Sequence, residues 1–140
     1  MQQDTSIDDG RLRITSGTPW EARVGYSRAL RVGPFLFVTG TMAADESGTI
    51  VHPDDAGAQA SYVFEKIRRA LEAAGGRMED VVRTRMYVTD IRDQEAVGAA
   101  HAAALGHVRP CATMVQVGPL AAADARVEIE VDAIVGDGGG

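Results

Sequence analysis

The 140-residue sequence lacks the features that mark several common classes of protein. Cys111 is its only cysteine, so no disulfide can form within the chain, which suits a reducing compartment. No apolar stretch approaches the roughly 20 residues that a membrane span needs. The start of the chain is polar and acidic, unlike a signal peptide. We therefore expect a cytoplasmic protein with no membrane partner.

A strong positive charge is also missing. The formal net charge is −6, and no run of Lys and Arg occurs. Nucleic-acid-binding proteins usually carry a basic surface that displaces counterions from the phosphates. We therefore expect no nucleic-acid partner, and a ribonuclease activity is the least favoured of the functions considered.

Motifs for metals and cofactors are missing as well. The three histidines, His52, His101 and His107, do not have metal-ligand spacing, and no C-x-x-C occurs. No G-x-G-x-x-G or Walker pattern is present. His101 falls on the apolar face of an expected helix, where a half-buried, hydrogen-bonded histidine is the simplest interpretation. The sequence thus predicts neither a metal nor an organic cofactor.

The pattern of apolar residues predicts one α+β domain over residues 11–135, with flexible tails at 1–10 and 136–140. Strands and helices are recognised by apolar periods of 2.0 and 3.6 residues. Asp54 or Asp55 opens the first helix, and Gly75-Gly76 closes it. The expected strands are 29–32, 35–41, 81–89, 111–117 and 126–135, with a further one near 12–14. The first expected helix runs from its Asp54 or Asp55 cap to residue 74, with its apolar period over 60–74, and the second covers about 94–105.

Two helices cover only one face of such a sheet, so the other face meets water or a partner. The strand from Val81 to Thr89 alternates, with Val82, Thr84, Met86 and Val88 directed to one side. The opposite face receives six polar residues: Arg83, Arg85, Tyr87, Glu128, Glu130 and Asp132. Mixed charge of this kind fits a solvated face or a wet subunit interface, and the sequence alone favours the former.

Several segments, in their order and spacing, resemble the RidA/YjgF family of reactive-intermediate deaminases. The similarity covers roughly residues 24–135. The segments are Tyr26-Ser27-Arg28-Ala29, Val32-Gly33, Leu36-Phe37-Val38-Thr39-Gly40, Leu71-Glu72-Ala73-Ala74-Gly75-Gly76, Asp80-Val81-Val82-Arg83-Thr84, Tyr87-Val88-Thr89-Asp90, Arg109-Pro110, Val115-Gln116-Val117 and Val127-Glu128-Ile129-Glu130.

This resemblance implies a chorismate-mutase-like fold: a mixed β-sheet with two helices on one face. It also implies a homotrimer whose sheets form a central barrel, with small-molecule clefts between neighbouring subunits. Well-known members hydrolyse 2-enamine and 2-imine acids to 2-keto acids and ammonia, with no metal or cofactor.

The resemblance also implies site residues. Tyr26 matches a tyrosine near the cleft, and the strand-end Ser-Gly of the family reads Thr39-Gly40 here. Glu128 matches the glutamate that orients water. From the residues alone, alternating acids on a last strand are more often merely solvated, so the catalytic role of Glu128 rests on the resemblance.

The strand after Pro110 departs from the family pattern. Deaminating members read Pro-Ala-Arg-Ser/Thr, whereas this chain has Ala112 where the arginine stands, followed by Thr113 and Met114. The family arginine forms charge-assisted hydrogen bonds to the substrate carboxylate, each worth roughly 1.5–3 kcal/mol. Because alanine cannot replace them, we expect an uncharged or apolar part of the ligand beside Ala112 and Met114. Arg109 is a candidate replacement from the preceding loop.

Other arginines, on other strands or subunits, are further candidates for the missing cation: Arg83, Arg85 and Arg126. Two functions therefore stay open alongside the disfavoured ribonuclease. The first is a hydrolase of the family type whose specificity differs from simple 2-imino acids. The second is a non-catalytic, ligand-binding trimer in which Glu128 is only a polar lining residue.

Overall fold

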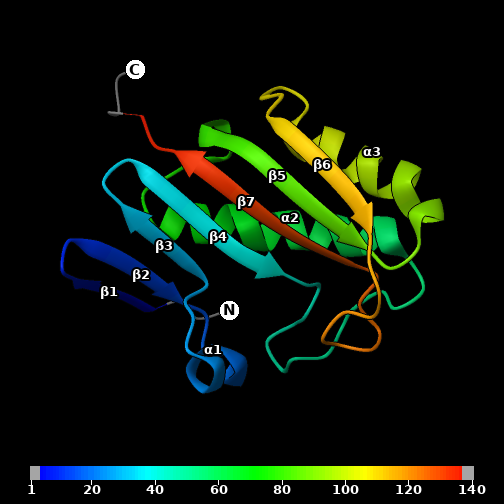
Figure 1. Cartoon of the computed structure of the whole chain (residues 1–140), viewed down its shortest axis with the longest axis horizontal. Coiled ribbons are helices and arrows are strands. Elements are labelled where there is room, and N and C mark those ends of the chain that lie inside the picture. Colours follow the sequence, from blue (N-terminus) through cyan, green and yellow to red (C-terminus); the bar gives the residue numbers. More distant parts are fainter. Residues whose placement is uncertain (1–3, 137–140) are drawn as a thin grey trace.

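Seven strands form one mixed sheet in the order β1-β2-β3-β4-β7-β5-β6 (Figure 1). This computed structural model describes residues 4–136. Every neighbouring pair is antiparallel except β5 and β6, which are parallel. The strands are β1 (Asp4–Asp8), β2 (Arg11–Thr15), β3 (Ala29–Val32), β4 (Phe35–Thr41), β5 (Val81–Val88), β6 (Cys111–Gln116) and β7 (Val127–Ile134).

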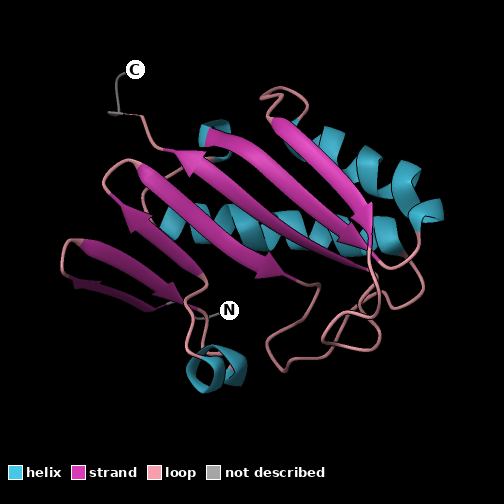
Figure 2. Ribbon diagram, in the orientation of Figure 1, coloured by secondary structure: helices cyan, strands magenta, loops and turns pink. Residues whose placement is uncertain are grey.

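Two long helices, α2 (Ala56–Ala73) and α3 (Gln94–Leu105), lie on the same face of the sheet, as predicted (Figure 2). Of the two expected caps, Asp55 is the one used, since its side chain accepts a hydrogen bond from the Ala58 amide at 2.9 Å. A short helix, α1 (Pro19–Val24), was not predicted, because six residues are too few to show a helical period.

The core lies between the helices and the sheet. Side chains at helical spacing on α2 pack against alternate residues of β4 and β7, and burying each large one contributes roughly 1.5–3 kcal/mol. Those fully or almost fully buried include Leu36, Val38, Val63, Phe64, Ile67, Leu71, Ile129 and Val131. The alternation in β7 therefore directs Glu128, Glu130 and Asp132 to the opposite face, as expected.

One residue of β5 faces the side opposite to the predicted one. Val82 is 41% exposed, whereas Val81 is 3% exposed. The pairing of β5 with β7 shifts register between Val81 and Arg83, and this irregularity reverses the alternation at the start of the strand. From Thr84 onward the prediction is correct, because Thr84, Met86 and Val88 are buried.

The expected N-terminal tail is a second correction. Asp4–Asp8 forms β1, which pairs along its length with β2, so these residues are regular structure rather than an unstructured tail. The turn is Asp9-Gly10, with φ values of 53° and 72°. Asp-Gly with two positive φ angles is the favoured two-residue hairpin connection, and it extends the sheet. The remaining parts of the two predicted tails, residues 1–3 and 137–140, lie outside the described chain.

The face away from the helices, here called the open face, mixes charged and apolar side chains. Arg85 forms ion pairs with Asp132 at 3.1 Å and Glu130 at 3.5 Å. Large apolar side chains at least 37% exposed stand around them: Val32, Phe35, Phe37, Val115 and Ile134. Within residues 4–136, no helix has the length and apolar character needed to cross a membrane.

Candidate functional site

The end of β4 brings a backbone segment against the Glu128 side chain. The pairing of β4 with β7 shifts register between Val38 and Thr41, so Thr39 and Gly40 leave the regular ladder. A methyl group at position 40 would stand 2.8 Å from Glu128 Oε2. Glycine is therefore required at this position if the carboxylate is to lie against the strand.

Beneath this contact lies a buried ion pair, Glu21–Arg28, with 3.2 Å between Arg28 Nη2 and Glu21 Oε2. Arg28 Nη1 also donates to the carbonyl of Gly40 at 3.0 Å and to Thr41 Oγ1 at 3.2 Å. Glu21 accepts further hydrogen bonds from the amide and hydroxyl of Ser16 and the hydroxyl of Thr18. This network fixes α1 to the end of β4.

The network controls the ionisation of its two carboxyl groups in opposite directions. Burial alone would raise the pKa of Glu21, but the Ser16 and Thr18 hydrogen bonds and the Arg28 charge outweigh it, so this pKa lies below its usual value. Burial raises the pKa of Glu128, a rise that the Arg28 charge opposes and Glu130 reinforces. A half-buried carboxyl with a raised pKa is suited to general acid and base work.

Tyr26 completes this neighbourhood. The Cζ atom of Arg28 lies 5.8 Å from the centre of the Tyr26 ring, a cation–π contact. The amide of Thr39 donates to the carbonyl of Arg28 at 3.0 Å. Four residues singled out in the sequence thus gather around Arg28, and we call this group the glutamate half-site: Tyr26, Thr39, Gly40 and Glu128.

The other four predicted residues lie elsewhere, at the edge of the sheet. In the parallel pairing, Ala112 stands beside Thr84 and Met114 beside Met86, so both are directed to the helix face. Thr113 stands beside Arg85 on the open face, and Arg109 precedes the strand, exposed, with a φ of 58°. β5 separates β6 from β7, so within one chain these residues do not meet Glu128. We call them the edge half-site.

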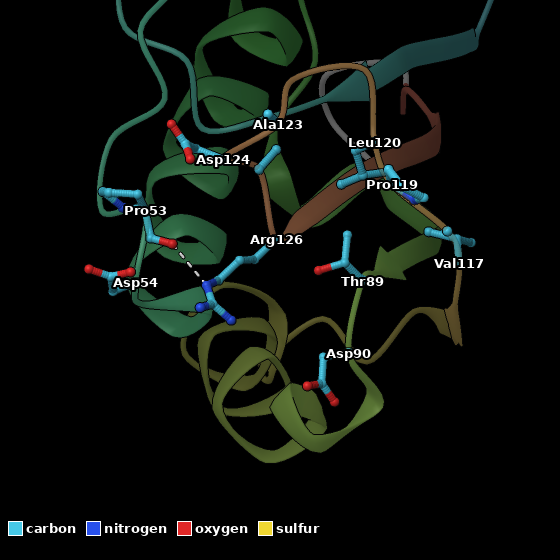
Figure 3. A pocket seen from close by; sticks show the side chains of 12 residues that line it. Pro53, Asp54, Thr89, Asp90, Val117, Pro119, Leu120, Ala123, Asp124 and Arg126 are labelled. Carbon is cyan, nitrogen blue, oxygen red and sulfur yellow. Dashed lines mark hydrogen bonds between the residues drawn. The ribbon is translucent and has the colours of Figure 1, made fainter.

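Of the three further arginines that the sequence analysis named as candidates, Arg85 and Arg126 are engaged by other groups, whereas Arg83 is not. Arg85 is held by Asp132 and Glu130 on the open face. Arg126 donates from Nε to the carbonyl of Pro53 at 2.8 Å, in a cavity of about 560 Å³ at one end of the sheet (Figure 3). Its Nη1 lies 3.7 Å from Asp93. Arg83 stands beside Cys111, and no hydrogen bond or ion pair of its side chain is found within residues 4–136.

Sequence reasoning missed the residues that organise the glutamate half-site, namely Glu21 and Arg28. They are seven positions apart across a helix end and a turn, a spacing without a periodic signal. Lys66 was missed for the same reason. It reaches from α2 to the carbonyls of Met42 and Ala44, at 3.2 and 2.9 Å, and burial followed by the Arg28 charge lowers its pKa to about 8.

His101 lies where the sequence analysis expected it. His101 is half-buried and forms a 2.8 Å hydrogen bond with Thr84 Oγ1, which confirms its interpretation as a satisfied histidine. Burial lowers the pKa of His101, so the neutral ring is favoured. His52 and His107 are exposed. Among the described residues, no three His, Cys, Asp or Glu side chains gather as a possible metal site.

A mixed sheet with two helices on one face places the chain among small α+β domains. The sequence profile described as Endoribonuclease L-PSP matches residues 16–135. The chain belongs to this family, also called YjgF/RidA, and has its chorismate-mutase-like fold.

Individual relatives agree with this assignment. The crystal structure of Rv2704 from Mycobacterium tuberculosis, a YjgF/YER057c/UK114 family member, shares 45% identity over 89% of this chain and 99% of that one, with a TM-score of 0.81. The crystal structure of RidA from a Psychrobacter species shares 32% identity over 79% of this chain and 89% of that one, with a TM-score of 0.74. The 3-aminoacrylate deaminase RutC of Acinetobacter baylyi shares 34% identity over 83% of this chain and 90% of its own length.

The first prediction concerns Arg28. Because its positive charge favours the ionised form of Glu128, Arg28→Gln should raise the pKa of the Glu128 carboxyl further. Carbon-detected NMR of the side-chain carboxyl across a pH series measures this directly. Arg28→Lys retains a charge and should shift the pKa less, and Arg23→Gln, on the exposed side of α1, serves as the control. An unchanged Glu128 pKa in Arg28→Gln would contradict the electrostatic role.

Proposed function

We propose that the protein is a cofactor-free hydrolase that acts on a small imine or enamine metabolite in clefts between the subunits of a homotrimer. The observation that carries this proposal is the glutamate half-site, where the Glu128 carboxyl, with a raised pKa, lies against Gly40 and within the field of Arg28, which Tyr26 contacts. Family membership, and a relative that is a 3-aminoacrylate deaminase, support the same chemistry.

In the proposed reaction, Glu128 accepts a proton from water while the oxygen attacks the imine carbon. The carboxyl then returns the proton to the nitrogen, which gives a carbinolamine. Glu128 next accepts the proton of the new hydroxyl group and delivers it to the amino nitrogen. The carbonyl forms as the carbon–nitrogen bond breaks, and ammonia leaves. The raised pKa of Glu128 helps the proton transfers in both directions, because a catalytic group works best when its pKa lies near the pH of the reaction. The Tyr26 hydroxyl and the backbone around Gly40 would orient the substrate.

A homotrimer is proposed because the two half-sites are separated within one chain. Apposition of the edge half-site of one subunit and the glutamate half-site of the next would form a complete cleft. The open face supports such an assembly, since Phe35 is 51% exposed and Val115 is 43% exposed there, both outside the groove described below. The barrel that the family resemblance implies would cover these side chains.

The edge half-site supports a specificity other than simple 2-imino acids. Ala112 offers no donor to a carboxylate, and Met114 contributes an apolar, partly buried side chain next to it. Arg109 precedes the strand in a left-handed backbone conformation and is exposed. We therefore propose an uncharged or apolar substrate portion at this point.

Turnover provides the second prediction. A panel of 2-imino acids of increasing side-chain length, freshly generated by an amino-acid oxidase, should show the smallest acceleration for 2-iminopropanoate. Glu128→Gln should lower the accelerated rates by about 100-fold or more, since general acid–base catalysis contributes 10²–10⁴. Imine consumption and ammonia release are the measurements. Glu72→Gln, on the exposed side of α2, is the control. Acceleration of no panel member would favour a non-catalytic binding trimer.

The third prediction restores the family arginine. Ala112→Arg should increase the rate with 2-iminopropanoate by about tenfold or more, because a guanidinium–carboxylate bond of roughly 1.5–3 kcal/mol would be regained. Ala102→Arg, at an exposed position of α3, is the matched control and should change nothing. Equal rates for Ala112→Arg and the unmodified protein would show that the lost arginine is not what limits activity on small imino acids.

The fourth prediction concerns assembly. Sedimentation velocity should give the mass of a trimer, and Val115→Asp should shift the protein toward the monomer by burying a charge in the interface. Val24→Asp changes a side chain that is 66% exposed on α1 and is the control. A monomeric unmodified protein at micromolar concentration would disprove the proposed assembly.

A further inference from the structure

The open face contains a groove of about 500 Å³ that none of the site residues from the edge half-site reaches. It crosses β2, β3, β4, β7 and β5, and two members of the glutamate half-site, Tyr26 and Thr39, stand at its border. The remaining lining residues are Arg11, Arg13, Gly25, Ser27, Leu30, Phe37, Val38, Arg85, Glu130 and Asp132.

The groove has one more positive than negative side chain. Arg11, Arg13 and Arg85 contribute +3, and Glu130 and Asp132 contribute −2, which leaves +1. Arg85 neutralises both acids, and the Tyr87 hydroxyl donates to Glu130 at 2.9 Å. Within residues 4–136, the side chains of Arg11 and Arg13 form no ion pair. Arg13 is also half-buried, and a partly desolvated guanidinium without a counter-ion favours an anion beside it.

The pairing register gives the direction of the groove. Arg13 stands opposite Leu30, and Leu30 opposite Phe37, so an apolar floor leads away from the arginine. Thr39 lies two residues beyond Phe37 on β4 and directly precedes Gly40, which stands against Glu128. Standard strand spacings place the backbone of Glu128 roughly 14 Å across the sheet and about 13 Å along the strands from that of Arg13.

This separation excludes a direct contact between Arg13 and a group adjacent to the reacting carbon. An arginine side chain shortens the gap but does not close it. Arg28, which is nearer to Glu128, already makes four hydrogen bonds within the chain, to Glu21, Gly40 and Thr41. It therefore has little capacity left for a ligand carboxylate.

We propose that the Arg11–Arg13 end of the groove binds a remote acidic group of the substrate, and that the apolar floor of Leu30 and Phe37 receives the chain between this group and the reacting carbon. The substrate class is then an elongated imine or enamine with a distal carboxylate. This inference rests on the proposed function for the reacting group, whereas the binding of the acid by Arg13 stands independently of turnover.

Hexanoate and its neutral analogue hexanamide test the inference, because they share an apolar chain and differ in charge. Binding is followed by NMR of the amides of Tyr26 and Thr39 in the full-length protein. Hexanoate should bind and hexanamide should not, and Arg13→Gln should weaken hexanoate binding about tenfold or more. Arg13→Lys should retain part of the affinity for hexanoate, because it keeps the positive charge. Arg69→Gln, on the helix side of the molecule, should leave it unchanged.

Three results would overturn the inference: no shift of these amides with hexanoate, equal binding of both probes, or equal binding by Arg13→Gln. Circular dichroism and unfolding curves establish that each variant is folded, and Arg11→Gln provides a second, more exposed position. Because the probes undergo no reaction, acid binding without turnover would refute only the proposed hydrolase. Turnover with no dependence on Arg13 would refute only the acid-binding groove.

Discussion

The buried pair of Glu21 and Arg28 is the interaction on which the glutamate half-site depends. It connects a short helix near the N-terminus to the last residues of β4, and Arg28 acts at the same time on a backbone carbonyl and on the charge of Glu128. Removing one partner would leave an uncompensated buried charge, which typically costs about 3–5 kcal/mol. One ion pair thus links the stability of this region to the protonation of its principal carboxyl.

The candidate site residues are divided between the centre and one edge of the same sheet. The bulge in β4 and the glycine at position 40 shape one part, and a parallel edge strand with small and apolar side chains shapes the other. Neither part encloses a ligand alone. Because the two parts lie on different strands, a substitution at the edge strand can leave Glu128 and its surroundings unchanged.

Much of the fold could be predicted, because its elements obey simple periods. The limits of β4 and α3 are those that the alternation and the helical pattern predicted. The errors have local causes. A register shift between Val81 and Arg83 turns the Val82 side chain to the face opposite to the predicted one, and the Asp9-Gly10 turn makes a hairpin of residues expected to be a tail. The site was harder to predict, because Glu21 and Arg28 interact through tertiary contacts that no sequence spacing reveals, and because the position of Ala112 relative to Glu128 depends on strand order.

The order of strands also constrains how the chain is made. β7 is the last strand in the sequence, yet it lies between β4 and β5 in the middle of the sheet. Until β7 has left the ribosome, β4 and β5 each have an edge without a hydrogen-bonded neighbour. The apolar side of α2 also lacks part of the sheet against which it packs. Newly made chains are therefore exposed to aggregation until β7 has been synthesised, and a truncation within β7 would remove the centre of the sheet rather than its border.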